Sequence, residues 1–348
     1  MNTPLILLRH RRLRADLTLL AVAVVWGSAF VVQRVAALHM GPLLFNGVRF
    51  LLGALTLSAA TWGRWRAMSR LEWQGGTLAG LVLLAAVTLQ QIGLQSTTAG
   101  KAGFITGLYV VLVPLFLALQ ALPALQALLR SLGKGVGPAP APVEGVRGCR
   151  QRLHGAAGSA PLLAVAGLFL LSTGGSTPSE GQLTLAPGDG LELISAVLWA
   201  LHVILIGRLA GRTNGLRLAL VQYLACGSLS TALGLAFELH TLGGLATAWW
   251  AVVYGGVLSV GVGYTLQVIG QKATPAADAA IILSMEAAFA ALFGWLLLGE
   301  TLTVRQLLGC GLMLAGMLLA QASALRRAEP HRPPHTNSSV VTTYKETT

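Results

Sequence analysis

Long, continuous apolar segments recur along most of this chain and are separated by short polar stretches. A helix rises 1.5 Å per residue, so a segment of about 20 apolar residues can cross the hydrocarbon core of a bilayer. The segments lack the alternating pattern of transmembrane β-strands. The pattern therefore predicts an all-α membrane protein with ten transmembrane helices, at 17–36, 42–62, 75–95, 102–120, 160–176, 189–207, 216–237, 248–271, 276–299 and 303–324.

The composition agrees with a chain that lies mostly in lipid. Mean hydropathy is +0.70, and 54% of the residues are hydrophobic while only 10% are charged. Soluble domains have about 25% charged residues. Further apolar segments follow the first one directly and no small-residue cleavage site stands out, so we expect it to remain as a helix and not to be removed as a signal peptide.

The chain contains an internal repeat. Residues 266–296 align without a gap to residues 89–119, at a spacing of 177, and a weaker match at a spacing of 173 pairs Trp26 with Trp199. The matching positions include glutamine, glycine and threonine, which apolar bias alone does not produce. The sequence therefore predicts two halves of similar architecture.

Each predicted half has five helices, at 17–176 and 189–324. Five is an odd number, so the second half enters the membrane from the side opposite to the first. We therefore expect two inverted five-helix repeats related by a pseudo-two-fold axis in the membrane plane. Secondary transporters built in this way hold their substrate near the midplane, where the repeats meet.

The basic residues indicate the orientation. The net charge is +12, and 20 of the 24 Lys and Arg residues fall in segments that share one face if the N-terminus is cytoplasmic. Basic residues near helix ends favour that face. We expect a cytoplasmic N-terminus at 1–16 and a disordered cytoplasmic tail at 325–348. The charge thus reflects membrane topology, and no nucleic-acid partner is expected.

Several runs resemble an EamA-type member of the drug/metabolite transporter superfamily; they are WGSAFVVQRVA at 26–36, GPLLFNGVRF at 41–50, TTAGKAGFITGLYVVLVPLF at 97–116, GYTLQVIGQKATPAADAAIILSMEAAFAALFGWLLLGE at 263–300 and LLGCGLMLAGMLL at 307–319. The resemblance covers the first four and the last five predicted helices. It implies a ten-helix transporter of the bacterial inner membrane with an inverted five-plus-five repeat. Such proteins mostly move small metabolites, often outward.

Two features depart from the family pattern. The connection at 121–160, normally short, is long here and rich in glycine, proline and arginine, so it is either a flexible cytoplasmic insertion or a stretch with an incorrect reading frame. Ala287 stands where the family has a proline after the glutamate. The sequence therefore leaves open whether this helix has the kink that the family has near the midplane.

Glu286 is the acidic residue that we place deepest in the membrane, about ten residues and roughly 15 Å into its helix. One interpretation is a protonation site or a ligand for a substrate amine, because intramembrane carboxyls usually face a cavity or the bundle interior. The other is a structural carboxyl capped by nearby hydroxyl groups or by Arg49. Proton coupling through Glu286 follows from the first interpretation.

Arg49 and two glutamines are further candidates. Arg49 either reaches the interface and caps carbonyl groups or contacts substrate, and the structural role is the more common one. Gln90 and Gln267 are equivalent positions in the repeat. They either bind substrate from both halves or join helices by hydrogen bonds.

Aromatic and polar residues complete the predicted lining of a substrate site. Any one of the aromatic residues is more often packing, and a single buried histidine is more often hydrogen-bonded than a proton relay. The remaining candidates are Trp26, Trp199, Tyr109, Tyr264, His202 and Gln222.

The predicted function is a secondary transporter that exports a small metabolite, an amino acid or a related compound, by alternating access. No Walker-type loop indicates ATP hydrolysis, and the three cysteines form no close pair, so no cofactor and no metal site are expected. The expected partners are the lipid bilayer, the substrate and protons, and the oligomeric state is open. The alternative is an intramembrane enzyme such as a hydrolase that uses His202, although no serine or aspartate dyad accompanies this histidine.

Overall fold

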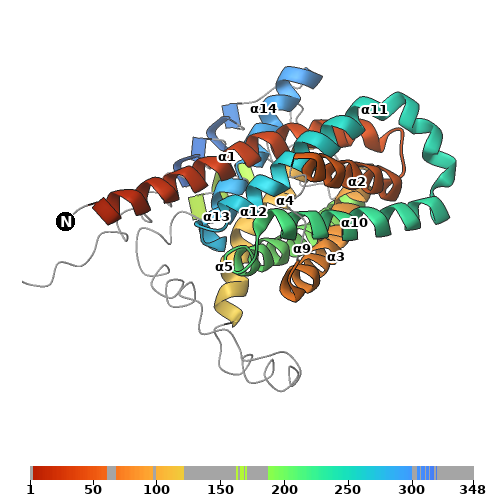
Figure 1. Cartoon of the computed structure of the whole chain (residues 1–348). Helices are drawn as coiled ribbons and strands as arrows, with labels where there is room; N and C mark the ends of the chain where they lie inside the picture. The colour runs from red at the N-terminus through yellow and green to blue at the C-terminus, as the bar shows by residue number, and fades with distance from the viewer. Residues whose placement is uncertain are drawn as a thin grey trace, which may run out of the picture.

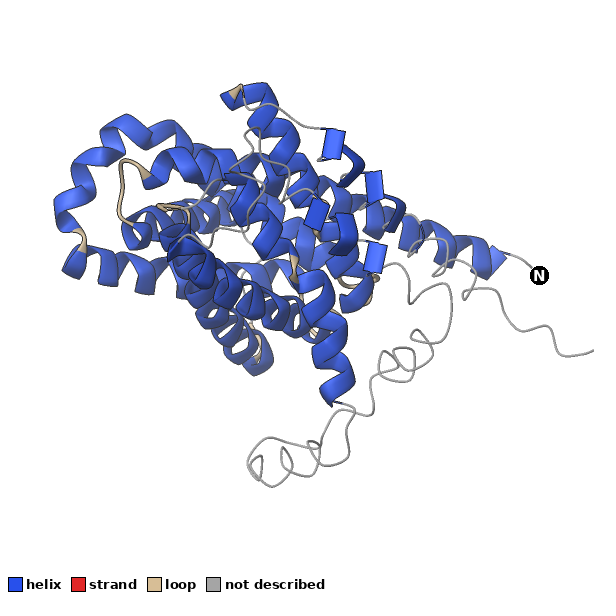
Figure 2. Cartoon of the chain, turned by 180° about the vertical axis from the view of Figure 1, so that it is seen from behind, coloured by secondary structure: helices blue, strands red, loops and turns tan. Residues whose placement is uncertain are grey.

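The computed structural model describes residues 3–60, 68–96, 99–120 and 187–299, with isolated pieces between 162 and 170 and between 304 and 319. Within this part of the chain every regular element is a helix (Figure 2), which confirms the all-α prediction. The predicted loop at 121–160 and the tail at 325–348 lie outside the described residues. The predicted spans at 160–176 and 303–324 lie mostly outside them.

The elements follow the chain as a bundle of helices (Figure 1). They are α1 (Thr3–Ala37), α2 (Pro42–Ala60), α3 (Arg70–Gly93), α4 (Ala99–Gly107), α5 (Tyr109–Gln120), α9 (Pro187–Leu209), α10 (Gly215–Phe237), η1 (Leu239–Gly244), α11 (Leu245–Val253), the π-helix η2 (Tyr254–Tyr264), α12 (Thr265–Gly270), α13 (Ala276–Leu283) and α14 (Glu286–Leu298).

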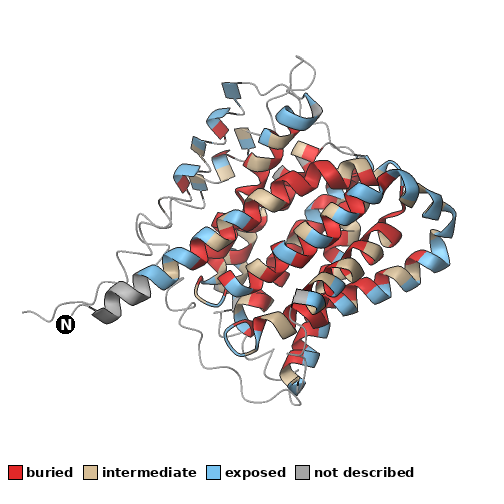
Figure 3. Ribbon diagram, turned by 45° about the horizontal axis from the view of Figure 1, so that its top comes forward, coloured by how far each residue is buried: buried red, intermediate tan, exposed pale blue. Residues whose placement is uncertain are grey.

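Seven helical segments of the described chain are long and apolar enough to cross a membrane. They are His10–Ala37, Pro42–Ala59, Arg70–Gly93, Pro187–Leu209, Gly215–Phe237, Leu239–Gly270 and Ala276–Leu297. Each overlaps one predicted span, and the shorter apolar stretch Ile105–Leu117 overlaps an eighth. The protein is therefore a multi-pass membrane protein. Large apolar side chains such as Leu201, Leu229 and Trp249 are exposed on the outer helix faces, where lipid would cover them (Figure 3).

Polar side chains fasten the helix ends at one end of the bundle. Ser69 and Glu72 form a capping box that begins α3, and Glu72 Oε1 also accepts a 2.9 Å hydrogen bond from the backbone N–H of Asn214, the residue that caps α10. Arg12 pairs with Asp16 of its own helix and with Asp278 of α13, each at 2.8 Å. These contacts tie α3 to α10 and α1 to α13.

The second helices of the two predicted halves, α2 and α10, approach each other closely. Gly47 lies against Thr231, and one turn further along α2, Leu51 lies against Gly227. A Cβ added to Gly47 would come within 2.4 Å of the Thr231 hydroxyl oxygen, so only glycine permits this approach. The residue numbers fall in α10 as they rise in α2, so the two helices run in opposite directions.

Two predicted spans, 102–120 and 276–299, are each broken into two helices. Leu108 separates α4 from α5, and Ser284 and Met285 separate α13 from α14. At both breaks a backbone hydrogen bond spans three residues, where a regular α-helix has four. The N–H of Leu108 donates to Ile105 O at 3.1 Å, and the N–H of Met285 donates to Ile282 O at 3.2 Å. Leu108 and Met285 occupy equivalent positions in the repeat alignment.

The break before Glu286 answers the question that the sequence left open, because it is present although Ala287 replaces a proline. The hydroxyl of Ser284 donates a 2.8 Å hydrogen bond to the carbonyl of Ile281, one turn earlier. Side-chain hydrogen bonds of this kind compete with the helical ladder and bend helices. Serine therefore accompanies the break in this chain where the family uses proline.

Candidate functional site

A cavity opens at the centre of the bundle, between α1, α2, α3, the two broken helices, α9 and η2. The space between the atoms that line it is about 400 Å³, part of which is open to its surroundings. Seven of the ten predicted site residues line it: Trp26, Arg49, Gln90, Tyr109, Trp199, Tyr264 and Glu286. The analysis of the sequence missed six others: Phe30, Gln33, Thr106, Val203, Ser259 and Leu283.

Glu286 is the first residue of α14 and is only 4% exposed. Its Oε1 accepts a 3.0 Å hydrogen bond from the hydroxyl of Tyr109, which is the first residue of α5. The partial positive charge of a helix N-terminus favours a carboxylate at this position. Glu286 and Tyr109 are equivalent residues of the repeat, 177 positions apart, so the two broken helices meet at their breaks.

Arg49 is the other ionisable group in the cavity wall apart from tyrosine. It is 1% exposed, and its guanidinium lies 5.0 Å from the ring centre of Phe45 and 5.3 Å from that of Phe50. Its Nε and Nη2 have no hydrogen-bond partner among the described residues. Of the alternatives considered for Arg49, reaching the interface is excluded, because the side chain is buried in the bundle.

Arg49 and Glu286 line the same cavity without forming an ion pair, in contrast to Arg12 and Asp278. The structural role in which Arg49 caps Glu286 is therefore not found, whereas capping by a hydroxyl group is. A buried cation with free donors is costly unless an anion pairs with it. The cavity thus presents one unpaired cation and one carboxyl.

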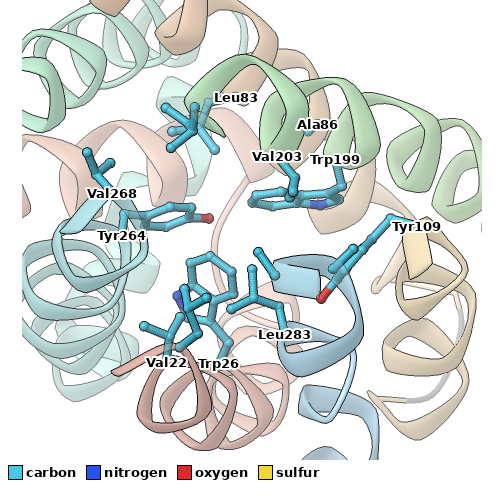
Figure 4. Packing of buried hydrophobic residues seen from close by; sticks show 14 of the residues in the cluster. Val22, Trp26, Leu83, Ala86, Tyr109, Trp199, Val203, Tyr264, Val268 and Leu283 are labelled. Atoms are coloured by element: carbon cyan, nitrogen blue, oxygen red, sulfur yellow. The ribbon is translucent and has the colours of Figure 1, made fainter. Parts of the chain in front are cut away.

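Aromatic rings form a wall of the cavity and point toward one another from α1, α9 and η2 (Figure 4). The ring centres of Trp26 and Tyr264 are 4.6 Å apart, those of Trp26 and Trp199 are 5.9 Å apart, and Trp199 stacks on Tyr264 at 5.9 Å. Trp26 Nε1 donates to the carbonyl of Ser259 at 3.3 Å, while Trp199 Nε1 is buried without a partner. The wall is mainly packing, with one free donor.

Three predicted residues lie outside the cavity lining. His202 Nε2 and Gln222 Oε1 are 3.1 Å apart and hydrogen-bonded to each other, as expected for a structural histidine. Gln267 is fully buried, and neither its Nε2 nor its Oε1 has a partner among the described residues. Its repeat counterpart Gln90 does line the cavity, so the two glutamines are not used alike.

A second buried carboxyl, Glu192 of α9, escaped the sequence analysis. Its Oε2 accepts a 3.3 Å hydrogen bond from the hydroxyl of Thr106, which itself accepts one of 3.0 Å from Gln90 Nε2. Thr106 and Gln90 both line the cavity. An acidic residue within the predicted span 189–207 was the feature that could have revealed it.

Comparison with known proteins agrees with this architecture. The model of the EamA-like transporter family matches residues 13–122 and 186–321. An uncharacterized transporter of Archaeoglobus fulgidus is 31% identical over 316 residues, which cover 89% of this chain and 86% of that protein.

Two further matches concern a named exporter and a solved structure. The threonine/homoserine exporter RhtA of Escherichia coli K12 is 35% identical over 162 residues, 45% of this chain and 52% of the exporter. One solved crystal structure matches with a TM-score of 0.64 at 21% identity, over 91% of this chain and 99% of that one, which shows a shared fold. Because the family model covers both halves of the sequence, the chain belongs to the EamA-like transporter family, as the resemblance implied.

Proposed function

We propose that this protein exports a small amino acid, or a closely related compound, across the inner membrane of a bacterium by alternating access. The observation that carries the proposal is that two oppositely charged groups, Arg49 and Glu286, line one central cavity without pairing with each other, and that Arg49 has free donors. A zwitterion complements both of them. The similarity to a threonine/homoserine exporter over part of the chain supports this class of substrate.

The carboxylate and the ammonium group of the substrate would bind to different residues of the cavity. The planar guanidinium of Arg49 suits a carboxylate, which it can bind through two parallel hydrogen bonds. Glu286, with Oε1 held by Tyr109, can accept a hydrogen bond from an ammonium group. The side chain of the substrate would lie against Trp26 and Trp199. In this scheme the carboxyl of Glu286 takes up a proton when the amine leaves, so that protons are exchanged for substrate.

The proposed inverted repeat has support from four features. The two stretches that match the family model begin at residues 13 and 186, the same spacing that separates Trp26 from Trp199. α2 and α10 run in opposite directions, as an axis in the membrane plane requires. The helix breaks occur at equivalent positions. Two equivalent pairs, Trp26 with Trp199 and Tyr109 with Glu286, are in contact.

Substrate analogues test the proposed function. Liposomes that contain the purified protein are loaded with radioactive threonine, and unlabelled competitors are added outside. The competitors are threonine, homoserine, the corresponding amines without the carboxylate and the corresponding hydroxy acids without the ammonium group. We expect the amino acids to exchange and each analogue to compete at least about 30-fold more weakly, because a buried group that loses its partner costs at least about 2 kcal/mol.

Equal competition by either set of analogues would contradict binding of a zwitterion. The same samples address the alternative, an intramembrane hydrolase that uses His202. Recovery of a chemically altered compound from detergent-solubilised protein would favour the enzyme, whereas flux of unchanged compound favours transport.

The proposed orientation predicts which loops face the cytoplasm. Reporters fused after Arg70 and after Arg212 are expected to report a cytoplasmic location, and one within 177–187, which lacks Lys and Arg, an external location. The hydrogen bond between Glu72 and Asn214 supports a common side for the first two sites. A cytoplasmic result for the 177–187 reporter would reject the inverted arrangement.

A further inference from the structure

Glu192 is a fully buried carboxyl that the proposed binding of the amino acid does not use. It is the sixth residue of α9, and its side chain has 0% exposure. One carboxyl oxygen, Oε2, accepts the hydrogen bond from Thr106, and the other, Oε1, has no partner among the described residues. A carboxylate in this position would carry a buried charge that only one hydroxyl group compensates.

The surroundings of Glu192 are shaped for the carboxyl. A Cβ added to Gly93 of α3 would come within 2.7 Å of Glu192 Oε1, so the carboxyl fills the space that this glycine leaves. Thr106 and Gln90 connect the other oxygen to the central cavity by two hydrogen bonds, of 3.3 and 3.0 Å. The carboxyl thus lies behind the cavity wall, and Thr106 connects it to the cavity by hydrogen bonds.

Few charged groups lie near Glu192. Asp189 lies one turn earlier in the same helix, and two carboxylates so placed repel each other. Gly93 of α3 and Thr106 of α4, which lie against the carboxyl, are uncharged. Tyr109 of α5 is hydrogen-bonded to Glu286, and Asp278 of α13 is paired with Arg12. No described cation is therefore available to Glu192, and a proton is the simplest partner.

The network exists in one half of the repeat only. The position equivalent to Glu192, 173 residues earlier, is Leu19, and the position equivalent to Thr106, 177 residues later, is Leu283. The equivalent positions Gln90 and Gln267, in contrast, carry the same residue in both halves. A helix-packing requirement common to both halves would not place an acid and a hydroxyl in just one of them.

We propose that Glu192 is a second proton-binding site, which is separate from the amino-acid site at Arg49 and Glu286 and binds and releases one proton in each transport cycle. The carboxylate takes a proton from water on one side of the membrane and returns it to water on the other, with no other bond made or broken. The role of Glu192 in transport rests on the proposed function, whereas the binding of a proton by Glu192 does not.

Infrared spectroscopy tests proton binding without any substrate. We expect reconstituted protein in the absence of amino acid to show a protonated carboxyl band that disappears as the pH is raised and is missing in Glu192→Gln. Thr106→Val should shift this band, because the hydrogen bond to the carboxyl is lost, while Thr106→Ser should leave it in place. Absence of a titrating band that depends on Glu192 would overturn the proposal, even if amino acids are transported.

The number of exchanged protons tests the role in transport. With the membrane potential held at zero and no sodium present, a difference of one pH unit supports about tenfold accumulation per proton. We expect the wild type to approach about hundredfold and Glu192→Gln about tenfold, with unchanged exchange of threonine at equal pH. Glu238→Gln is the matched control, because Glu238 bonds to the backbone of Leu44 outside the cavity.

The possible failures are distinguishable. The same accumulation limit for the wild type and Glu192→Gln would overturn the second proton, and so would accumulation that requires sodium. If the wild type neither binds nor moves any amino acid, the proposed function fails. The infrared titration then still decides whether Glu192 binds a proton.

Discussion

Replacement of Glu286 by glutamine is expected to weaken the binding of amino acids by about 30-fold or more, since removing one partner of a buried charge pair costs at least about 2 kcal/mol. The same change should lower the accumulation supported by one pH unit from about hundredfold to about tenfold at most, because an amide cannot take up the proton exchanged at this position and only the proton at Glu192 remains. Glutamine has the size of glutamate and can still accept the hydrogen bond from Tyr109. Binding is measured by calorimetry in detergent and accumulation in proteoliposomes.

Tyr109→Phe is the matched variant for this experiment. It removes the hydroxyl group that holds Glu286 but keeps the ring and the carboxyl, so we expect a loss of about threefold to tenfold, in keeping with one hydrogen bond. Unchanged accumulation by Glu286→Gln would reject both roles of this carboxyl and leave it as a residue that holds the break between α13 and α14. Tight binding with a lowered accumulation limit would retain proton coupling and reject the contact with the amine.

Arg49→Gln is expected to remove the preference for a carboxylate. In the wild type, an amine without the carboxylate should bind at least about 30-fold more weakly than the corresponding amino acid. In Arg49→Gln the two compounds should bind alike, because the group that distinguishes them is gone. Such a non-additive result is the mark of a direct contact, whereas a structural effect would weaken both compounds equally in the variant.

Two further substitutions control for charge and for folding. Arg49→Lys keeps the cation but loses the planar pair of donors, so part of the preference for the carboxylate should remain. Arg34→Gln removes an arginine of α1 that bonds to the carbonyl of Leu94, away from the cavity lining, and should preserve the preference in full. If Arg49→Gln still discriminates between amino acid and amine as the wild type does, Arg49 does not bind the carboxylate.

The helices were predictable because their information is local. Long apolar runs identify a span whatever its neighbours are, and the gapless alignment between 89–119 and 266–296 located equivalent residues such as Gln90 and Gln267. Burial of Glu286 followed from its depth in an apolar segment. Seven of the ten candidate residues accordingly line one cavity.

The details of the site depended on contacts between distant segments. Whether Arg49 turns to the interface or into the bundle is decided by Phe45, Phe50 and the surrounding helices, not by its own position in α2. Thr106 became important only through its bonds to Gln90 and Glu192, 16 and 86 residues away. The break before Glu286 occurs without the proline that usually indicates a helix break in a sequence.

The contact between Tyr109 and Glu286 also bears on how such a chain evolves. A residue on a two-fold axis meets its own copy, so an assembly of two identical halves would bring two phenols or two carboxyls together there. Two carboxylates repel each other unless they share a proton, and two phenols are not acidic near neutral pH. Fusion of the halves into one chain frees the copies to diverge, and one can become the acid while the other becomes its hydrogen-bond donor. A carboxyl held by a phenol at this contact is thus an arrangement that two identical halves do not form.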